Sequence, residues 1–392
     1  MEVKQIYTLM NSVSDEVLGK TGLITEDLTG IVDMGTEIFN SNAVDNYVKS
    51  LVNHIGKVVF VNRPYSGKVP SVLMDSWEFG SVLEKVSADI PQATANESWE
   101  LADGGEYKQD VFYKPKVSAK FFNSKVTFEV PVSITELQVK ESFGSASQLN
   151  GFLSMIYNAV DKSMTIKTDA LIMRTINNMV GETLKADSAT FGTGATADYS
   201  KGSTTRCINL LKLYNAATGS ELTADKAITT PDFIRFASYQ MGLVSERMQS
   251  ISTLFNVGGK ERFTSKDNMH AVLLSDFAQA AHTYLYADTY HNGEVMLPQA
   301  ESVPCWQASG TDYSFANVSK IDIKNGTEDS DVVSISGVLG VLFDRDALGV
   351  CNTNKRVTTN YNAKAEFYNN YYKFDCGYFN DTNENFVVFF VA

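Results

Sequence analysis

Residues that could carry out catalysis are few in this sequence and stand far apart. It has no HExxH, GxSxG or Walker-type P-loop pattern, which are the spacings that metalloproteases, serine hydrolases and nucleotide-binding enzymes require. A glycine pair, Gly192-Thr-Gly194, lies in a polar junction without a strand before it, so it does not predict a phosphate cradle. The histidines have no metal-site spacing and are expected to be packing or surface residues: His54, His270, His282 and His291.

The acidic and sulfur-containing side chains also indicate no reactive site. Asp103 with Glu106, and Asp329 with Asp331, fall in turn-rich segments where carboxylates are usually solvated, and their spacing is too sparse for a calcium loop. The cysteines form no CxxC pair and are expected to be free thiols in a reducing compartment: Cys207, Cys305, Cys351 and Cys376. We therefore expect no catalytic residue, no cofactor and no metal; the chain is not expected to be an enzyme.

Composition excludes further classes of protein. The chain has 392 residues, 44% of them hydrophobic, which is enough for a sizeable core, and its formal net charge is −13. A protein that binds nucleic acid through phosphates needs a surplus of Lys and Arg, so no sequence-specific DNA binding is expected. The start of the chain lacks a signal peptide, and no apolar run approaches the roughly 20 residues of a membrane helix. We expect synthesis in the cytoplasm and no membrane contact.

The most informative elements are two strand-like stretches, 77–86 and 117–130, joined by a polar, turn-rich tip over 91–105. A two-stranded ribbon of this length is marginally stable by itself in water. Its apolar side chains therefore need a partner outside the ribbon, and we expect that partner to be another copy of the chain. The residues expected in this contact between subunits are Trp77, Phe79, Val82, Trp99 and Phe121.

Helical periodicity is strongest over 147–183, which predicts an unusually long helix. Before the ribbon, 1–50 shows a weak helical pattern interrupted by glycines, which is typical of an extended arm. A helix at 44–56 and a short strand at 57–61 follow it. After a polar junction at 185–204, the pattern predicts helices over 205–217 and 231–255, a strand at 271–274, a helix that begins at Ser275, and alternating strands from 357 to the end.

The order of these parts resembles the major capsid proteins of tailed bacteriophages with the Hong Kong 97-type fold, over essentially the full length. Three segments carry local likeness: 39–56 resembles the segment before that family's extended loop, 142–159 the entry to its spine helix, and 340–349 the strand that returns to its peripheral domain. The resemblance implies an α+β fold with an N-terminal arm, an extended β-hairpin loop, a peripheral domain with a long spine helix, and an axial domain.

Domain boundaries follow from the same resemblance. It implies an arm over 1–50, an extended loop over 71–125 and an axial domain over 191–345. The peripheral domain would combine 51–70 and 126–190, including the spine helix, with return strands over 346–392.

The implied function is a structural one: self-assembly, as hexamers and pentamers, into the icosahedral shell that encloses the double-stranded DNA genome of a tailed bacteriophage. The implied partners are copies of the same chain, with portal, separate scaffolding and decoration proteins, and the implied location is the virion. Two alternatives stay open from the sequence. One is an encapsulin-type nanocompartment shell, and the other is an unrecognised cytosolic hydrolase.

Overall fold

The structure of the chain is a computed structural model. The structure describes residues 11–12, 15–16, 69–74, 83–91, 93, 95–96, 98, 101–106, 110–138, 146–286, 300–307 and 312–392. Apart from residues 11–12 and 15–16, the arm predicted over 1–50 lies outside the described residues. The predicted helix at 44–56 and strand at 57–61 also lie outside them.

The chain divides into two compact units, each assembled from segments that are distant in sequence. Unit 1 comprises 1–78, 124–172 and 350–377, and unit 2 comprises 79–123, 173–349 and 378–392. The longest helix, α5 (Ala146–Ala186), contributes its first part to unit 1 and its last turns to unit 2.

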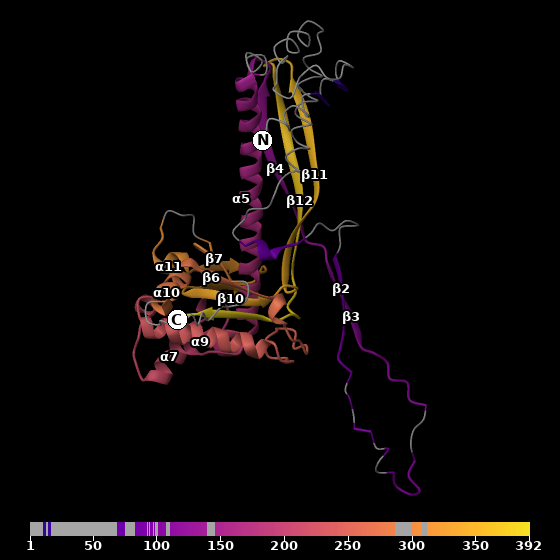
Figure 1. The fold of residues 1–392 in the computed structure, drawn as a ribbon, viewed down its shortest axis with the longest axis vertical. Coiled ribbons are helices and arrows are strands. Elements are labelled where there is room, and N and C mark those ends of the chain that lie inside the picture. The colour runs from indigo at the N-terminus through magenta and orange to yellow at the C-terminus, as the bar shows by residue number, and fades with distance from the viewer. Residues whose placement is uncertain are drawn as a thin grey trace. The chain divides into compact units, whose positions relative to one another are not determined.

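Unit 1 is built on a four-stranded sheet in the order β1-β11-β12-β4 (Figure 1). The strands are β1 (Leu73–Met74), β4 (Lys125–Thr135), β11 (Leu348–Asn362) and β12 (Phe367–Asn380). β4 and β12 pair antiparallel along their length, from Phe367 opposite Thr135 to Gly377 opposite Lys125. A long unbroken ladder of this kind pairs the backbone polar groups on the facing sides of the two strands.

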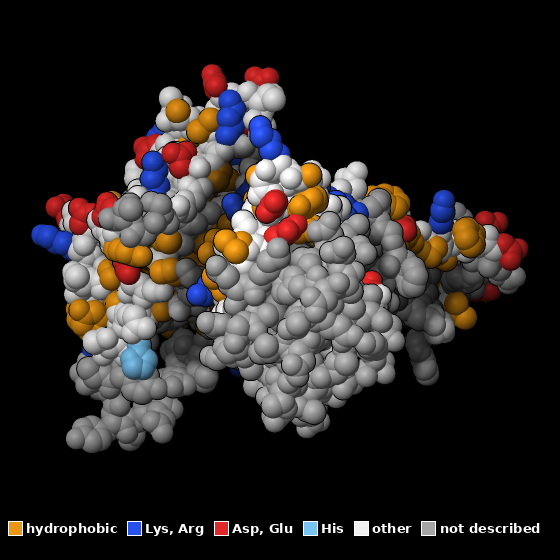
Figure 2. Space-filling model, turned by 90° about the horizontal axis from the view of Figure 1, so that it is seen from above, with side chains coloured by type: hydrophobic (Ala, Val, Ile, Leu, Met, Phe, Trp, Pro, Cys, Tyr) orange, Lys and Arg blue, Asp and Glu red, His pale blue; other side chains and the backbone are white. Residues whose placement is uncertain are grey.

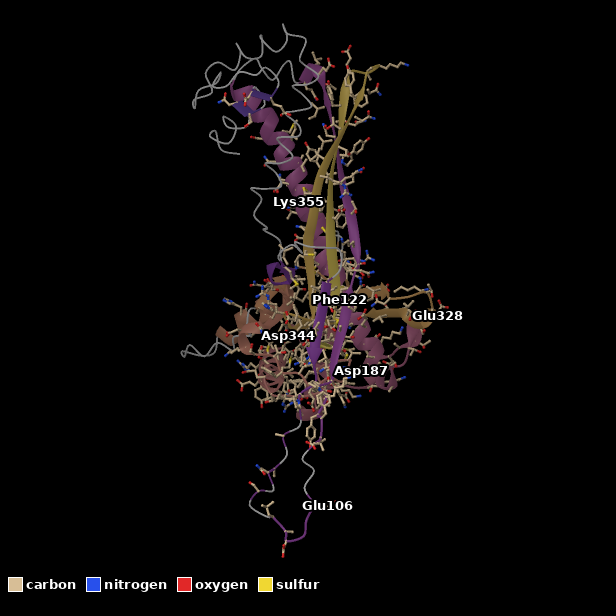
Figure 3. All side chains as sticks on the ribbon, turned by 90° about the vertical axis from the view of Figure 1, so that its right-hand side faces the viewer. Glu106, Phe122, Asp187, Glu328, Asp344 and Lys355 are labelled. Carbon is tan, nitrogen blue, oxygen red and sulfur yellow. The ribbon has the colours of Figure 1, made fainter. Side chains whose placement is uncertain are left out.

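The two faces of this sheet differ in polarity because side chains alternate along each strand. Along β12 every second side chain is buried, including Tyr372 and Phe374, and the first part of α5 runs beside these strands in Figures 1 and 3. α5 buries Val160 and Met164 in the same unit. The opposite face carries polar cross-strand pairs, such as Thr127 Oγ1 donating to Asp375 Oδ1 at 2.6 Å.

Unit 2 is built on a five-stranded sheet in the order β5-β13-β10-β6-β7. The strands are β5 (Cys207–Asn209), β6 (Met269–Leu274), β7 (Ala300–Val303), β10 (Val338–Asp344) and β13 (Phe386–Phe390). Every residue of β10 and β13 is buried, so both faces of the sheet are covered. These strands are accordingly continuous apolar runs and do not alternate.

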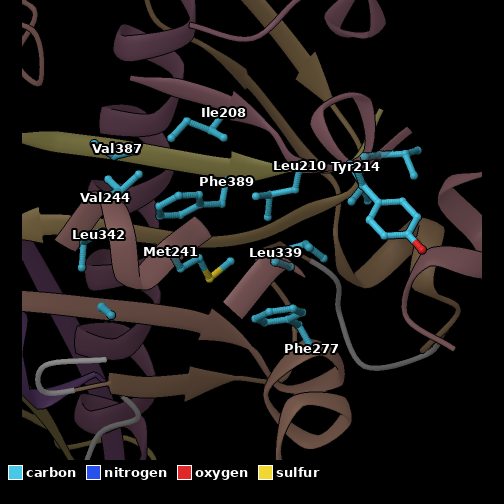
Figure 4. Close-up of a cluster of buried hydrophobic side chains, with 14 of the residues drawn as sticks. Ile208, Leu210, Tyr214, Met241, Val244, Phe277, Leu339, Leu342, Val387 and Phe389 are labelled. Atoms are coloured by element: carbon cyan, nitrogen blue, oxygen red, sulfur yellow. The ribbon is translucent and has the colours of Figure 1, made fainter. Parts of the chain in front are cut away.

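Three helices pack beside this sheet: α7 (Leu210–Thr218), α9 (Pro231–Met248) and α10 (Ser275–Tyr286). Figure 4 shows the cluster in which Met241 and Val244 of α9 and Phe277 of α10 meet Leu342 and Phe389 of the sheet. This cluster is the main core of unit 2. The remaining short elements of unit 2 are α6 (Ser188–Phe191), α8 (Ala224–Ala227), α11 (Phe315–Val318), and the antiparallel pair β8 (Ile321–Lys324) and β9 (Val332–Ile335).

The described 3-10 turns are distributed over both units. Unit 1 contains η1 (Pro70–Val72), and unit 2 contains η3 (Gly194–Thr196), η4 (Tyr199–Lys201), η5 (Lys266–Asn268) and η6 (Asp329–Asp331).

Three expectations from the sequence need correction. The stretch 117–130 is not one strand, because it breaks after Phe122 and β4 begins at Lys125 in a different sheet. The helix expected over 205–217 begins only at Leu210, since Cys207–Asn209 pairs with β13 as strand β5. The helix expected to reach residue 255 ends at Met248, and the chain then forms a bridge between Ser252 and Arg262.

The strands of 346–392 divide between the two sheets, with β11 and β12 in the four-stranded sheet and β13 in the five-stranded sheet. β13 pairs with β10 and β5 in unit 2, because a strand that is apolar on both faces is buried only inside a covered sheet. Along the chain, one unit gives way to the other after residues 78, 123, 172, 349 and 377. The predicted domain boundaries and names stay a prediction.

Candidate assembly surface

The candidate site is a two-stranded ribbon in unit 2, made of β2 (Leu83–Ala88) and β3 (Val117–Phe122). The strands pair antiparallel from Leu83 opposite Phe122 to Ala88 opposite Val117, and Figure 1 shows them side by side. Alternation gives the ribbon two faces. The inner face carries Leu83, Lys85, Ser87, Ser118, Lys120 and Phe122, and the outer face carries Glu84, Val86, Ala88, Val117, Ala119 and Phe121.

The inner face contacts the rest of unit 2 through charged groups. Lys85 Nζ lies 3.0 Å from Asp381 Oδ2 and 2.8 Å from Glu384 Oε1. Lys120 Nζ lies 3.0 Å from Asp381 Oδ1. Next to them, the ring of Phe122 lies 5.1 Å from that of Phe379, centroid to centroid. Figure 3 labels Phe122 at this end of the ribbon and Glu106 in the loop at the other end.

The attraction between these opposite charges outweighs the effect of burial on the pKa values of Lys85 and Asp381. Burial alone would lower the pKa of Lys85, but hydrogen bonding and attraction from Glu384 and Asp381 hold that pKa above its usual value. Burial would likewise raise the pKa of Asp381, and the charge of Lys85, with hydrogen bonds from Asn383 and Lys120, outweighs it and holds that pKa low. Both groups are therefore ionised at neutral pH.

A small cavity of about 140 Å³ lies against this cluster. Its lining consists of Lys85, Ser87, Ser118, Ala119, Lys120, Arg262, Asp381, Asn383 and Glu384. The lining is charged and hydroxylic, which matches a polar junction and not a pocket for an apolar small molecule.

The outer face of the ribbon is apolar and faces solvent. The exposed fractions are 62% for Val86, 60% for Val117 and 62% for Phe121, and Glu84 is the only charged residue among the six on this face. A strand pair that packs on its own domain normally turns its apolar face inward. This ribbon does the reverse, so its apolar face is free to be covered by another molecule.

Beyond β2 and β3 the ribbon continues into a loop whose described side chains are exposed. Phe112 and Tyr113, which are adjacent in sequence, are 85% and 84% exposed, and Leu101 is exposed as well. Two neighbouring aromatic side chains left in water are unusual on a monomer and typical of surfaces that bind another protein.

Of the five residues predicted for contact between subunits, the structure describes one. Phe121 lies on the outer face, whereas Trp77, Phe79, Val82 and Trp99 lie outside the described residues. The ribbon and its loop also expose Val86, Val117, Phe112 and Tyr113, which the sequence prediction did not name. Val86 and Val117 could have been found by following the period-two pattern outward from Phe121 and across to the paired strand.

The side chains with potential reactivity in the described residues are either exposed or held in structural contacts. Asp331 pairs with Lys185 and accepts the backbone N–H of Glu328, and Asp103 and Glu106 are exposed. Gly194 has φ +63, and a Cβ there would lie 2.7 Å from the carbonyl oxygen of Asp329, so this glycine serves a tight turn. His270 is buried beside Phe343.

None of the four cysteines, all of which the structure describes, forms a disulfide, and three of them, Cys207, Cys351 and Cys376, are buried. Over the described ranges, no three His, Cys, Asp or Glu side chains gather as metal ligands. No helix in the described part of the chain combines the length and the apolar character needed to cross a bilayer. Among the described residues coloured in Figure 2, Lys and Arg side chains are interspersed with Asp and Glu.

Solved structures with a similar fold are phage capsids. The capsid structure of Staphylococcus phage Andhra matches with a TM-score of 0.50 at 10% identity, covering 84% of this chain and 86% of that one. A structure of bacteriophage P68, titled for its head fiber and inner core protein, matches with a TM-score of 0.48 at 7% identity, covering 83% and 85%. The Andhra match confirms the predicted α+β capsid fold.

At the level of sequence, no curated protein matches the chain. A family model does match, that of the Phi29-like phage major capsid protein, and it covers residues 9–390. The match therefore covers most of both units and includes β2 and β3 of the ribbon. The chain belongs to the Phi29-like phage major capsid protein family.

Proposed function

We propose that the outer face of the ribbon is where one copy of this capsid protein binds the next copy in the shell. The chain is a structural capsid protein that assembles with copies of itself, and its family and fold are not those of an enzyme. The observation that supports the proposal is the reversed polarity of the ribbon, with Val86, Val117 and Phe121 in water and the lysines turned inward.

Burial of the outer face would contribute favourably to assembly. Burial of apolar surface contributes about 25 cal/mol per Å², so roughly 200 Å² per ribbon offers about 5 kcal/mol before the cost of association. Modest contacts suffice in a shell, because each copy makes several of them at once and closure makes them mutually reinforcing. The predicted residues Trp77, Phe79, Val82 and Trp99 would extend the same contact.

The finer assignments extend this proposal. The subunits form hexamers and pentamers of an icosahedral shell around the double-stranded DNA of a tailed phage. Portal, separate scaffolding and decoration proteins are the further partners, and the chain is made in the cytoplasm of the host. The net charge of −13 supports an enclosing role without tight DNA binding. Neither an encapsulin nor a hydrolase finds support in the family match.

The test is a triple variant, Val86→Ser/Val117→Ser/Phe121→Ser, made in host cells that produce the other head proteins of the phage. We expect a folded subunit that is soluble but at least about 10-fold reduced in particle yield, because the outer face no longer offers apolar area. Glu84→Gln, on the same face, changes a side chain without removing apolar surface and is the matched control. Particle counts by electron microscopy that equal the control would contradict the proposal.

A further inference from the structure

Asp381 occupies a special place at the junction between the ribbon and the rest of unit 2. It is buried in the turn between β12 and β13. Its Oδ2 pairs with Lys85 of β2, and its Oδ1 pairs with Lys120 of β3. Its backbone is fixed as well, because Asp381 N donates to Ala347 O at 2.6 Å. The carboxylate is therefore a rigid acceptor.

The two lysines need such an acceptor because of the register of the ribbon. Lys85 and Lys120 are directly opposite one another in the strand pair. Like charges in this position repel and destabilise the pair. The carboxylate of Asp381 lies between them and forms an ion pair with each lysine, which offsets their repulsion and attaches both strands to the same residue.

The other contacts of the junction each reach only one strand. Glu384 binds Lys85 of β2 and also Arg262 at 3.4 Å, and Phe122 of β3 meets Phe379. The outermost pair, Asp89 with Lys260 at 3.0 Å, is partly exposed on both sides, and exposed pairs contribute little. Among the described residues, Asp381 alone has ion pairs to both β2 and β3.

We propose that Asp381 is the positioning residue of the ribbon, which fixes the direction in which the outer face points before a second copy binds. This goes beyond the proposed contact between copies and rests on it only for the consequence in assembly. The positioning itself is a property of one subunit. Holding a binding element in place beforehand lowers the entropy cost of association.

The test measures the ribbon in isolated subunits at pH 7.5. Spin labels at Asp103→Cys and Lys226→Cys report the distance from the loop of the ribbon to α8, in a Cys305→Ser background because the other three cysteines are buried. We expect one narrow distance distribution in the parent and a broad one in Asp381→Asn. Amide hydrogen exchange in β2 and β3 should be about 10- to 100-fold faster in Asp381→Asn. Asp89→Asn, which breaks the partly exposed pair, is the matched control and should change exchange less than about 3-fold.

A second variant separates positioning from a general role of Asp381 in its turn. In Asp381→Asn/Lys120→Gln the like-charge pair is gone and Lys85 keeps its ion pair with Glu384, so the ribbon should recover a narrower distribution than in Asp381→Asn alone. An equally broad double variant would mean that Asp381 only shapes the turn, which overturns the proposal. Should Asp381→Asn fail to fold, Lys85→Gln/Lys120→Gln leaves the turn intact and should still loosen the ribbon; a narrow distribution there overturns the proposal too.

Particle yield of Asp381→Asn separates the positioning role of Asp381 from the role of the ribbon in contacts between copies. A loosened ribbon with reduced particle yield supports both proposals. A loosened ribbon with normal yield keeps Asp381 as the positioning residue and contradicts the role of the ribbon in contacts between copies. An unchanged distance distribution in Asp381→Asn overturns the positioning role, whatever the triple outer-face variant does.

Discussion

Single buried side chains of this protein couple its stability to pH, and His270 is the clearest case. It lies in β6 with neither ring nitrogen hydrogen-bonded within the described residues, and the ring of Phe343 lies 6.0 Å away. Burial, and then the charge of Arg345, lower the pKa of His270 below its usual value. The unfolded chain therefore binds a proton on this residue at a higher pH than the folded chain does.

The sign of the effect follows from that difference. Above about pH 6.5, the ordinary pKa of histidine, His270 is neutral in both the folded and the unfolded chain and does not change the free energy of unfolding. As the pH falls below that value, the unfolded chain takes up the proton first, so the free energy of unfolding decreases. We predict that His270→Leu lessens the loss of unfolding free energy between pH 7.5 and 5 by on the order of 1 kcal/mol. Urea unfolding at the two pH values measures it, with the exposed His282→Leu as control. An equal loss in His270→Leu and the parent would contradict the prediction.

At the scale of elements, the sequence predicts what local pattern controls and misses what distant partners control. The long helix was expected over 147–183 and spans Ala146–Ala186, because its apolar spacing is sustained over many turns. β5 was hidden inside a predicted helix, since Cys207–Asn209 becomes a strand only by pairing with β13, far along the chain. The ribbon was predicted, but its lysine contacts to Asp381 join residues too distant for any local pattern to reveal.

The close packing of α5 against β8 gives a prediction about this element. A Cβ at Gly181 would lie 2.3 Å from Ile323 Cδ1 and 3.1 Å from Ile323 Cγ1. We predict that Gly181→Ala gives no net stabilisation of unit 2, because displacing the side chains of Ile323 and Asn325 offsets the gain in helix propensity of about 1 kcal/mol. Ile323→Val removes the clashing methyl group and should relieve that cost in the double variant.

A matched control for this prediction lies in the same helix. A Cβ at Gly151 meets nothing within 4 Å, so Gly151→Ala should stabilise by about 0.5 to 1 kcal/mol through helix propensity alone. The midpoint of thermal unfolding is measured for Gly181→Ala, Ile323→Val, the double variant of these two, and Gly151→Ala. The reasoning would be wrong if Gly181→Ala proved as stabilising as Gly151→Ala.

At the scale of the whole molecule, two features oppose one another when copies meet. Each copy has a net charge of −13, so copies repel at long range. The outer face of the ribbon is nearly uncharged and attracts at short range by burial of apolar surface. The ion pairs of Lys85 and Lys120 lie within one chain, where partial burial protects them from screening. Salt should therefore weaken the repulsion more than it weakens the ribbon's position.

We accordingly predict that shells assemble from purified subunits more readily as salt rises. Raising NaCl from about 0.05 M to about 0.5 M shortens the screening length from roughly 14 Å to roughly 4 Å, which removes most repulsion between copies and leaves the apolar contact intact. The concentration of subunit needed for assembly, read by light scattering, should fall by at least about 3-fold. Sucrose at equal osmolality controls for general solute effects and should reproduce little of the fall. If salt instead raised that concentration, copies would be joined chiefly by ion pairs between chains, and the apolar face of the ribbon would not be the principal contact.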